Sequence, residues 1–369
     1  MTKIQYEELI AFHPGYYLKR YIENQGITQE ELAKRLQTTP KYVSDLVNAR
    51  INLTDEMALK LSLVCDTSVT MWLNLNQKYI EKKLLIEKRI KLDEECKLAK
   101  MLDYKFWSDL GFVKATKNIA EKVEELQRYL KISSLSVLTE RDFLVQYRSG
   151  VSKIEDIHVM NANAWVQTAI NIGTQSEVSP FNKNKLTHAI DEIRSMTVID
   201  PEVFYPRLVE LLAECGVALV LLPNLKNSGV NGAVKWLSKD KVVLALNNRR
   251  KYADVFWFAL FHELGHVLQQ RIKLLHVSDP NITNSDENEL ILKLEKDADD
   301  FAQNTLIPKS KYDAFINNNF KKFDKNTVLE FAKEIHLMPG IVVGRLQKDG
   351  YLSYQSALNK CKVQYEIGK

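Results

Sequence analysis

The spacing of apolar residues changes near residue 216, and this change constrains the fold more than any other feature of the chain. Before it, apolar side chains recur with the period of helices. After it come three short β-type runs, Val217–Leu222, Gly232–Leu237 and Lys241–Leu246. A strongly apolar helix at about Tyr252–Arg271 and an amphipathic helix at about Glu289–Leu306 follow. We therefore expect a mainly α protein with a small β-sheet, of the α+β class.

The length of 369 residues predicts two or three domains, because the chain is too long to fold around one ordinary hydrophobic core. The patterns divide it into a five-helix domain (1–80), a helical linker or middle region (81–200), a core that holds the sheet (201–310) and a C-terminal helical cap (311–369). Within the middle region, breaks are expected near Gly173 and Ser179-Pro180, and within the cap a turn is expected at Pro339-Gly340.

Composition excludes several classes of protein. The four cysteines form no C-x-x-C pair, which argues against a thiolate metal site or a disulfide framework and fits a reducing cytosol. The N-terminus lacks the pattern of a signal peptide, and no apolar run approaches the roughly 18 residues of a membrane helix. Residues 1–80 balance nine Lys and Arg against nine Asp and Glu, so a polybasic tail is absent. A soluble, cytoplasmic protein without membrane contact is expected.

Two adjacent helices in the N-terminal domain are predicted to form a helix-turn-helix. Thr28 and Glu31 make a capping box, and Thr39-Pro40 provides an N-cap followed by proline at the first helical position. The helices Thr28–Leu36 and Pro40–Asn48 are joined by a turn short enough to force a steep crossing. Such a turn needs a positive φ, which falls at Gln37 at a cost of roughly 1 kcal/mol.

The polar face of the second helix is the candidate DNA-reading surface, since side chains near its N-terminus reach base edges in the major groove. Its outward residues are Lys41, Tyr42, Ser44, Asp45 and Asn48. The residues expected near phosphates are Gln29, Lys34, Lys41 and Arg50. The alternative interpretation is a small helical bundle whose polar face is simply solvated.

His262-Glu263-Leu264-Gly265-His266 is an HExxH sequence inside a predicted helix. Residues four apart share one helical face, so both imidazoles can reach one metal ion at the roughly 2.0–2.1 Å that zinc requires. Glu263 lies beside them, where it can take a proton from an activated water. The alternative for two buried histidines is an ordinary structural role in the core.

A catalytic zinc needs a third protein ligand, and Glu295 is the candidate. Ala298 and Ala302 share its helical face and are small, which allows a close approach to the histidine helix. Asp299 is predicted to accept the second ring N–H of a ligand histidine. His276 is a candidate oxyanion donor. Three acids in a nearby polar loop rank below Glu295 as ligands, namely Asp286, Glu287 and Glu289.

Residues 13–79 resemble the HigA-type antitoxin branch of the lambda-repressor-like (XRE) helix-turn-helix proteins. The resemblance rests on His13-Pro14-Gly15, the Leu32-Ala33 pair and Trp72-Leu73-Asn74-Leu75. It implies operator DNA binding as a homodimer on a two-fold site. The family usually has a glycine after the position of Asn48, where this chain has Ala49.

Residues 216–308 resemble the ImmA/IrrE family of zinc metallopeptidases, which have a thermolysin-like (zincin-like) arrangement of elements. The matching stretches are Gly216-Val217, Asn231-Gly232-Ala233 with Trp236, Phe256-Trp257-Phe258, His262–His266, Glu295 to Pro308, and Pro339 to Leu346. The resemblance implies His262, His266 and Glu295 as zinc ligands and Glu263 as the catalytic base. It also implies a repressor-type protein as substrate.

These observations predict a DNA-binding transcriptional regulator with a zinc-dependent endopeptidase domain. Its substrate is expected to add a strand to the sheet at Gly232–Trp236. The alternative is a HigA-like antitoxin with a cognate toxin, whose C-terminal domain is a sensor or scaffold with little proteolysis. A purely structural zinc is a third possibility, although such sites normally use cysteine. Manganese and iron stay open as alternatives to zinc.

Overall fold

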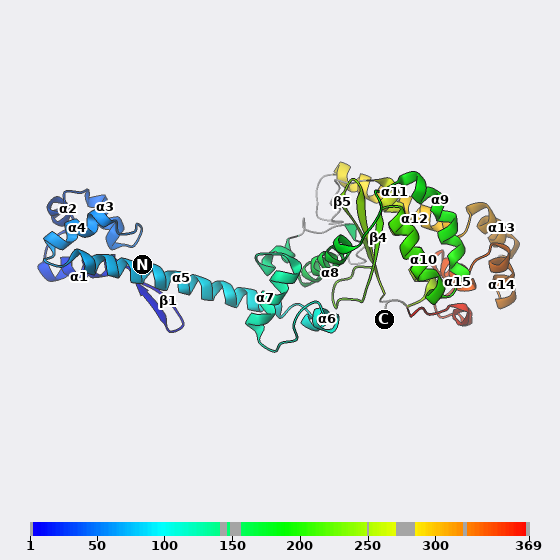
Figure 1. Ribbon diagram of the computed structural model, residues 1–369, viewed down its shortest axis with the longest axis horizontal. Helices are drawn as coiled ribbons and strands as arrows, with labels where there is room; N and C mark the ends of the chain where they lie inside the picture. The colour runs from blue at the N-terminus through cyan, green and yellow to red at the C-terminus, as the bar shows by residue number, and fades with distance from the viewer. Residues whose placement is uncertain are drawn as a thin grey trace. The chain divides into compact units, whose positions relative to one another are not determined.

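The computed structural model describes residues 3–140, 146–147, 156–248, 251–270, 285–319 and 323–366 (Figure 1). At 146–147, 156 and 285–291 it describes the backbone alone. The chain divides into two compact units, Met1–Lys97 and Leu98–Lys369. Helices and two small sheets make up the fold, which confirms the expected α+β class.

The N-terminal unit is built on five helices, as predicted. They are α1 (Pro14–Gln25), α2 (Gln29–Arg35), α3 (Pro40–Val47), α4 (Asp55–Val64) and α5 (Val69–Ala99). Threonines at 28, 39 and 54 start three of them, because each hydroxyl accepts a hydrogen bond from the backbone N–H three residues later. Their apolar faces enclose a core that includes Leu18, Leu32, Val43, Leu46 and Leu61.

The His13-Pro14-Gly15 sequence begins α1 and lets it approach α3 closely. Nδ1 of His13 accepts the Gly15 N–H at 3.0 Å, and Pro14 occupies the first helical turn. A Cβ on Gly15 would lie 2.0 Å from the carbonyl oxygen of Leu46, at the end of α3. Glycine is therefore required where these two helices meet.

A β-hairpin precedes the helices, and it was not predicted from the sequence. Strands β1 (Lys3–Tyr6) and β2 (Leu9–Phe12) pair antiparallel, and Glu7 takes a φ of 50° in the connection. The Glu7-Glu8 connection lacks the Asn-Gly or Asp-Gly signal of a two-residue turn. The hairpin packs on α5, where the Tyr6 hydroxyl donates to Asp93 at 2.6 Å.

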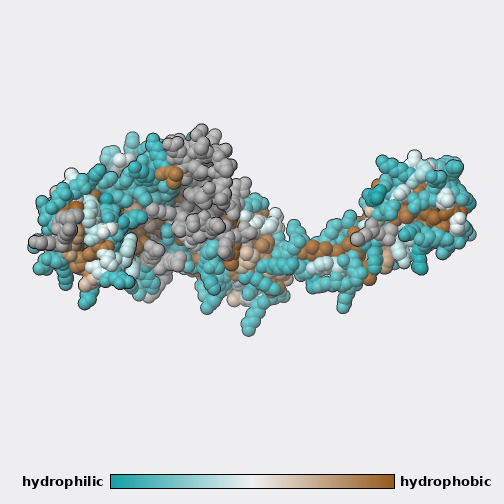
Figure 2. All heavy atoms as spheres, turned by 180° about the vertical axis from the view of Figure 1, so that it is seen from behind, coloured by the Kyte–Doolittle hydropathy of each residue, from teal (hydrophilic) through white to brown (hydrophobic). Residues whose placement is uncertain are grey.

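Helix α5 is 31 residues long and passes residue 80 without interruption. The limit predicted for the first domain therefore falls inside a helix, because the stretch contains neither glycine nor proline. Apolar side chains reach the surface along this unit, as the brown side chains in Figure 2 illustrate. They include Leu59, Leu63, Leu84 and Leu85, each more than half exposed.

The second unit contains a four-stranded sheet in the order β3-β5-β6-β4. Strands β4 (Val217–Leu222), β5 (Gly232–Ser238) and β6 (Lys241–Asn247) follow the predicted runs closely. The short strand β3 (Gln146–Tyr147) pairs with Ala233 and Val234 of β5. Part of the edge expected to receive a substrate strand is thus already paired, which corrects that prediction.

Helices cover both faces of this sheet (Figure 1). On one face lies α8 (Asp156–Gln175), and on the other α11 (Ala253–Gln269). The helix break predicted near Gly173 is confirmed, because α8 ends at Gln175, two residues later. The missing Cβ of Gly173 makes room for Val243 of β6. The predicted break at Ser179-Pro180 is confirmed, since the next helix begins at Lys183.

The remaining helices are α6 (Tyr104–Asp109), α7 (Ile119–Leu130), α9 (Lys183–Ser195), α10 (Pro201–Glu214), α12 (Ser285–Leu306), α13 (Lys309–Asn319), α14 (Lys325–Glu334) and α15 (Pro339–Lys348). The turn predicted at Pro339-Gly340 is instead the first turn of α15, where proline is favoured. No helix among the described residues combines the length and apolar character needed to cross a bilayer.

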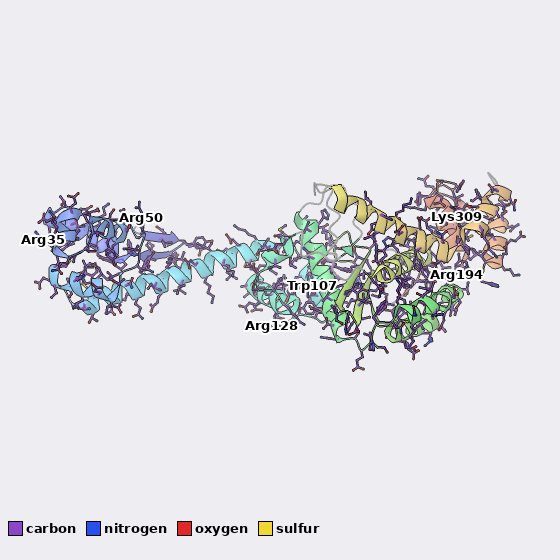
Figure 3. All side chains as sticks on the ribbon, turned by 90° about the horizontal axis from the view of Figure 1, so that it is seen from above. Arg35, Arg50, Trp107, Arg128, Arg194 and Lys309 are labelled. Carbon is purple, nitrogen blue, oxygen red and sulfur yellow. The ribbon has the colours of Figure 1, made fainter. Side chains whose placement is uncertain are left out.

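Side-chain hydrogen bonds connect distant segments of the second unit. Trp107 is fully buried and donates to the Thr168 hydroxyl of α8 at 2.8 Å, while Arg194 donates to carbonyls at the end of α12 and after α14 (Figure 3). Residues 98–138 and 156–200, which were expected in a linker or middle region, therefore take part in the same packed unit as the sheet.

Candidate metal centre and helix-turn-helix surface

The HExxH residues lie on the buried part of α11. This helix packs its apolar side chains against the sheet and against α15, so His262, Glu263 and His266 are only 2%, 3% and 4% exposed. Helix α12 runs alongside α11, and a Cβ on Gly265 would lie 3.1 Å from Cα of Ala298. The small residues thus allow the close helix contact that brings Glu295 to the histidines.

Two imidazole nitrogens and both oxygens of one carboxylate converge between these helices. Nε2 of His262 lies 3.1 Å from Nε2 of His266. The carboxylate of Glu295 lies 3.4 Å from the first nitrogen and 3.2 Å from the second. The structure therefore brings together the three residues that were predicted from the sequence to be metal ligands.

The other ring nitrogens face oxygen acceptors. Nδ1 of His262 lies 2.8 Å from Oδ1 of Asp299, and Nδ1 of His266 lies 3.1 Å from Oε1 of Gln269. Gln269 is itself oriented by a hydrogen bond to the carbonyl of Leu294. Both rings are thus set to donate from Nδ1, so that in the neutral form each Nε2 directs a lone pair into the cluster.

The two histidines and Glu295 shift one another's pKa values. Burial lowers the pKa of His262, but hydrogen bonds to Asp299 and Glu295 outweigh it and raise the pKa to about 9. The pKa of His266 is also raised, since Glu295 outweighs the effect of burial. Burial raises the pKa of Glu295, but the two histidines bring it far below its usual range. The site therefore favours a positive charge at its centre.

The donor set fits a zinc ion. Ligands on a tetrahedral zinc, each about 2.0–2.1 Å away, would be separated from one another by about 3.3 Å. The two imidazole nitrogens, 3.1 Å apart, are close to that value, and each lies 3.2 or 3.4 Å from a different oxygen of Glu295. With one ligand atom taken from each residue, the three atoms lie within 4.8 Å of one another. Two imidazoles and one carboxylate would also leave a fourth position for water, as catalytic zinc sites do.

Glu263 lies against the first residue of β5. A Cβ on Gly232 would be 2.3 Å from Oε1 of Glu263, so only glycine fits opposite this carboxylate. Glu263 also lines a cavity of about 470 Å³ together with His262. A buried carboxylate at the wall of a cleft and beside the candidate ligands is suited to proton transfer.

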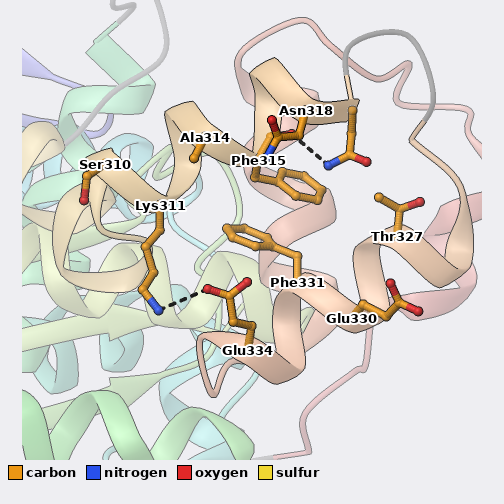
Figure 4. A pocket seen from close by; sticks show the side chains of 10 residues that line it. Ser310, Lys311, Ala314, Phe315, Asn318, Thr327, Glu330, Phe331 and Glu334 are labelled. Carbon is orange, nitrogen blue, oxygen red and sulfur yellow. Dashed lines mark hydrogen bonds and ion pairs between the residues drawn. The ribbon is translucent and has the colours of Figure 1, made fainter.

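Among the described residues, hollows also lie at two places away from α11. One, of about 390 Å³, lies between α13 and α14, where the Phe315 and Phe331 rings stack at 4.0 Å and Lys311 pairs with Glu334 (Figure 4). Among its described lining residues there is no histidine or cysteine, so it lacks the ligands of the α11 site. The other, of about 330 Å³, lies in the N-terminal unit beside α3.

The structure does not test some of the residues that were predicted to belong to the metal site. His276, the candidate oxyanion donor, lies outside the described residues, as do the side chains of Asp286, Glu287 and Glu289. Gln269, in contrast, was not predicted. Its only signal is its position three residues after His266, on the same helical face.

The candidate DNA-reading surface lies on α2, α3 and the loop after α3. Lys34, Lys41, Asn48 and Arg50 are exposed, and the remaining candidates, Gln29, Tyr42, Ser44 and Asp45, are half-buried. Nδ2 of Asn48 donates to the Ser44 carbonyl at 2.8 Å, and Arg50 pairs with Asp45 at 3.4 Å. Arg50 is labelled in Figure 3. Lys41, Tyr42 and Asp45 share the wall of the 330 Å³ hollow.

The backbone adopts a left-handed conformation just after α2 and again just after α3. Gln37 has a φ of 52°, as predicted, which turns the chain between α2 and α3. Ala49 has a φ of 56° directly after α3. A non-glycine residue in this conformation costs roughly 1 kcal/mol. Both connections therefore have left-handed backbone although neither position is a glycine.

Comparison with known proteins places this unit in a family. The helix-turn-helix family model matches residues 18–72. The HTH-type transcriptional regulator YddM of Escherichia coli (strain K12) is 36% identical over 62 residues, which cover 17% of this chain and 66% of that protein. Virulence-associated protein I of Dichelobacter nodosus is 30% identical over 73 residues, covering 20% and 68%.

A third relative, the HTH-type transcriptional regulator YbaQ of Escherichia coli (strain K12), is 43% identical over 58 residues, covering 16% of this chain and 51% of its own length. The matches thus span between 51% and 68% of the relatives. No solved structure matches the chain. Through its N-terminal unit the chain belongs to the helix-turn-helix family and carries the DNA-binding domain of a transcriptional regulator.

Proposed function

We propose that this regulator is a cytoplasmic protein whose C-terminal unit is a zinc-dependent endopeptidase acting on a repressor- or antitoxin-type protein. The convergence of His262, His266 and Glu295 within 3.4 Å of one another carries the proposal. The ImmA/IrrE-like sequence pattern of residues 216–308 supports it, because that pattern includes all three residues and Glu263.

Each residue has a distinct part in the proposed reaction. A zinc ion held by His262, His266 and Glu295 would lower the pKa of a water molecule and polarise the scissile carbonyl. Glu263 would accept the proton of the attacking water and return it to the leaving amine. Asp299 and Gln269 would hold the two imidazoles in the tautomer that presents Nε2 to the ion.

We further propose that α3 reads an operator as part of a homodimer. Lys41 on α3 and Asn48 directly after it are exposed, which suits base contacts. Lys34 and Arg50 flank the helix, which suits phosphate contacts. Exposed leucines on α4 and α5 supply apolar surface for a second copy. Replacing Lys41 or Asn48 with Ala should weaken binding to DNA from the chain's own promoter, measured by fluorescence anisotropy at fixed salt.

The peptidase is tested with two matched variants of the full chain, Glu263→Gln and His262→Ala. Zinc-loaded wild type is incubated with candidate repressors, including the chain's own N-terminal domain, and the products are analysed by mass spectrometry. Glu263→Gln should keep zinc and lose cleavage, whereas His262→Ala should lose both. Zinc binding without cleavage of any candidate would favour the alternative, in which this unit is a sensor or scaffold of an antitoxin.

A further inference from the structure

The cleft beside His262 and Glu263 has walls of two kinds. One part is apolar and includes Val255, Phe258 and Ile341. Another part is basic and consists of Arg345, Lys348 and Lys362. A ligand that fills this 470 Å³ space would therefore meet both an apolar and a cationic surface.

The charge of Lys362 is already neutralised. Its ammonium donates to the buried carboxylate of Asp254 at 2.6 Å, and the two side chains are only 13% and 9% exposed. This ion pair attaches the C-terminal segment to the start of α11, next to a hydrogen bond from the Ala253 N–H to the Val363 carbonyl. Lys362 thus builds the wall of the cleft and does not present an open charge.

Arg345 is also ion-paired, with Asp349, but unlike Lys362 it retains hydrogen-bond donors beyond that pair. Its Nε donates to Asp349 at 2.6 Å, and its guanidinium lies 4.6 Å from the centre of the Tyr312 ring. These two contacts fix the plane of the group, whose side chain is 19% exposed. Among the described residues, neither of its Nη atoms has a hydrogen-bond partner.

Lys348 adds a second cation on the same wall. It lies three residues after Arg345 on α15, so the two side chains share a helical face. Lys348 is exposed, and within the described part of the chain it makes no ion pair. The two residues together give the lining of the cleft a fixed fork of donors and an exposed ammonium.

We propose that this wall, Arg345 with Lys348, recognises an acidic side chain of the substrate peptide, and that the adjacent apolar wall takes an apolar side chain. A guanidinium whose Nη donors are open and whose plane is fixed is suited to a carboxylate, which it can bind through two parallel hydrogen bonds. The inference rests on the proposed peptidase, since it names the chemistry of that enzyme's substrate.

Cleavage specificity gives the first test. Zinc-loaded full-length protein is incubated with a synthetic peptide library in which Glu and Gln alternate at each position, and cleavage sites are read by mass spectrometry. The wild type should cleave Glu-containing peptides about tenfold faster than their Gln counterparts. Arg345→Gln should remove this preference, and Arg345→Lys should restore part of it. Arg207→Gln, which alters an exposed and similarly paired arginine on α10, should leave it unchanged.

Peptide binding gives a second test that does not depend on turnover. Fluorescein-labelled Glu and Gln peptides are titrated with zinc-loaded Glu263→Gln protein, and affinity is followed by anisotropy. Tighter binding of the Glu peptides, lost in Glu263→Gln/Arg345→Gln, would support the inference even if the wild type cleaves nothing. Cleavage without any acidic preference, or a preference that survives in Arg345→Gln protein with an unchanged melting temperature, would overturn it and leave the peptidase intact.

Discussion

Nε2 of His262 lies 3.1 Å from Nε2 of His266, and the Nδ1 atoms of the two rings face the oxygens of Asp299 and Gln269. When both imidazoles are neutral, as in a metal-bound site, these contacts direct the two Nε2 lone pairs at each other, an arrangement that a cation between them stabilises. Glu295 adds a negative charge to the same point. This relationship is the physical basis for assigning a metal to the α11–α12 interface.

Replacing Asp299 with Asn should weaken zinc binding by about 10- to 100-fold, because the carboxylate orients His262 and makes its Nε2 more basic. The affinity can be measured by competition with a fluorescent chelator. Asp300→Asn is the matched control, since Asp300 is the next residue of α12 and is exposed. Equal affinities for the two variants would show that Asp299 has no such role.

Replacing Gly232 with Ala should reduce peptide turnover at least about tenfold, because the new methyl group would displace the carboxylate of Glu263. Zinc content should stay at the wild-type level, since the three atoms nearest to the new methyl group all belong to Glu263 and not to a proposed ligand. Gly265→Ala should instead weaken zinc binding, because its new methyl group would crowd Ala298 and Phe301 of α12. Unchanged kcat in the Gly232 variant would argue against Glu263 as the base.

Replacing Gln37 or Ala49 with Gly should stabilise the N-terminal unit by up to about 1 kcal/mol, because both residues have positive φ. The greater freedom of glycine in the unfolded chain offsets part of this gain. Thermal denaturation of the full chain, followed by circular dichroism, measures the effect. Ala33→Gly, inside α2, should act in the opposite direction, and a loss of stability in both glycine variants would contradict the strain argument.

Acidification below about pH 6.5 should destabilise the N-terminal unit through His13. Burial lowers the pKa of His13, and the charge of Lys83 lowers it further against an opposing backbone contact with Ile51. The unfolded chain therefore binds a proton that the folded chain resists, so the free energy of unfolding decreases as pH falls, by at most about 1.4 kcal/mol per pH unit.

His13→Asn is the control for this pH dependence, because an asparagine oxygen can still accept the Gly15 N–H but does not titrate. Urea denaturation at pH 7.5 and pH 5.5 should show a smaller decrease for the variant than for the wild type. An identical decrease in both proteins would assign the pH dependence to other groups.

Local patterns were sufficient to predict most of the elements. The strand pattern of Val217–Leu222 and the caps at Thr28 and Thr39 correspond closely to the structure, because each depends on short-range chemistry. The sequence also predicted the left-handed φ of Gln37 from the shortness of its turn. The HExxH spacing was sufficient to predict that His262 and His266 lie on the same face of one helix.

Features that depend on packing between distant segments were missed or predicted wrongly. The pairing of β3 with β5 joins residues nearly ninety positions apart, and two strand residues carry no recognisable pattern. The packing reason for Gly173, which leaves space for Val243 of β6, was also missed, because only the sheet reveals it. The contact of Gln269 with His266 depends in the same way on α12, which orients the amide through the Leu294 carbonyl.

Metal analysis of the purified full-length chain tests the central claim most directly. We expect one zinc ion per chain, with an X-ray absorption spectrum of two nitrogen ligands at about 2.0–2.1 Å and oxygen ligands completing the shell. Glu295→Gln and His266→Ala should each reduce the bound zinc well below one equivalent. A chain that binds no metal, or whose zinc content is the same in these variants, would contradict a metal centre at His262, His266 and Glu295.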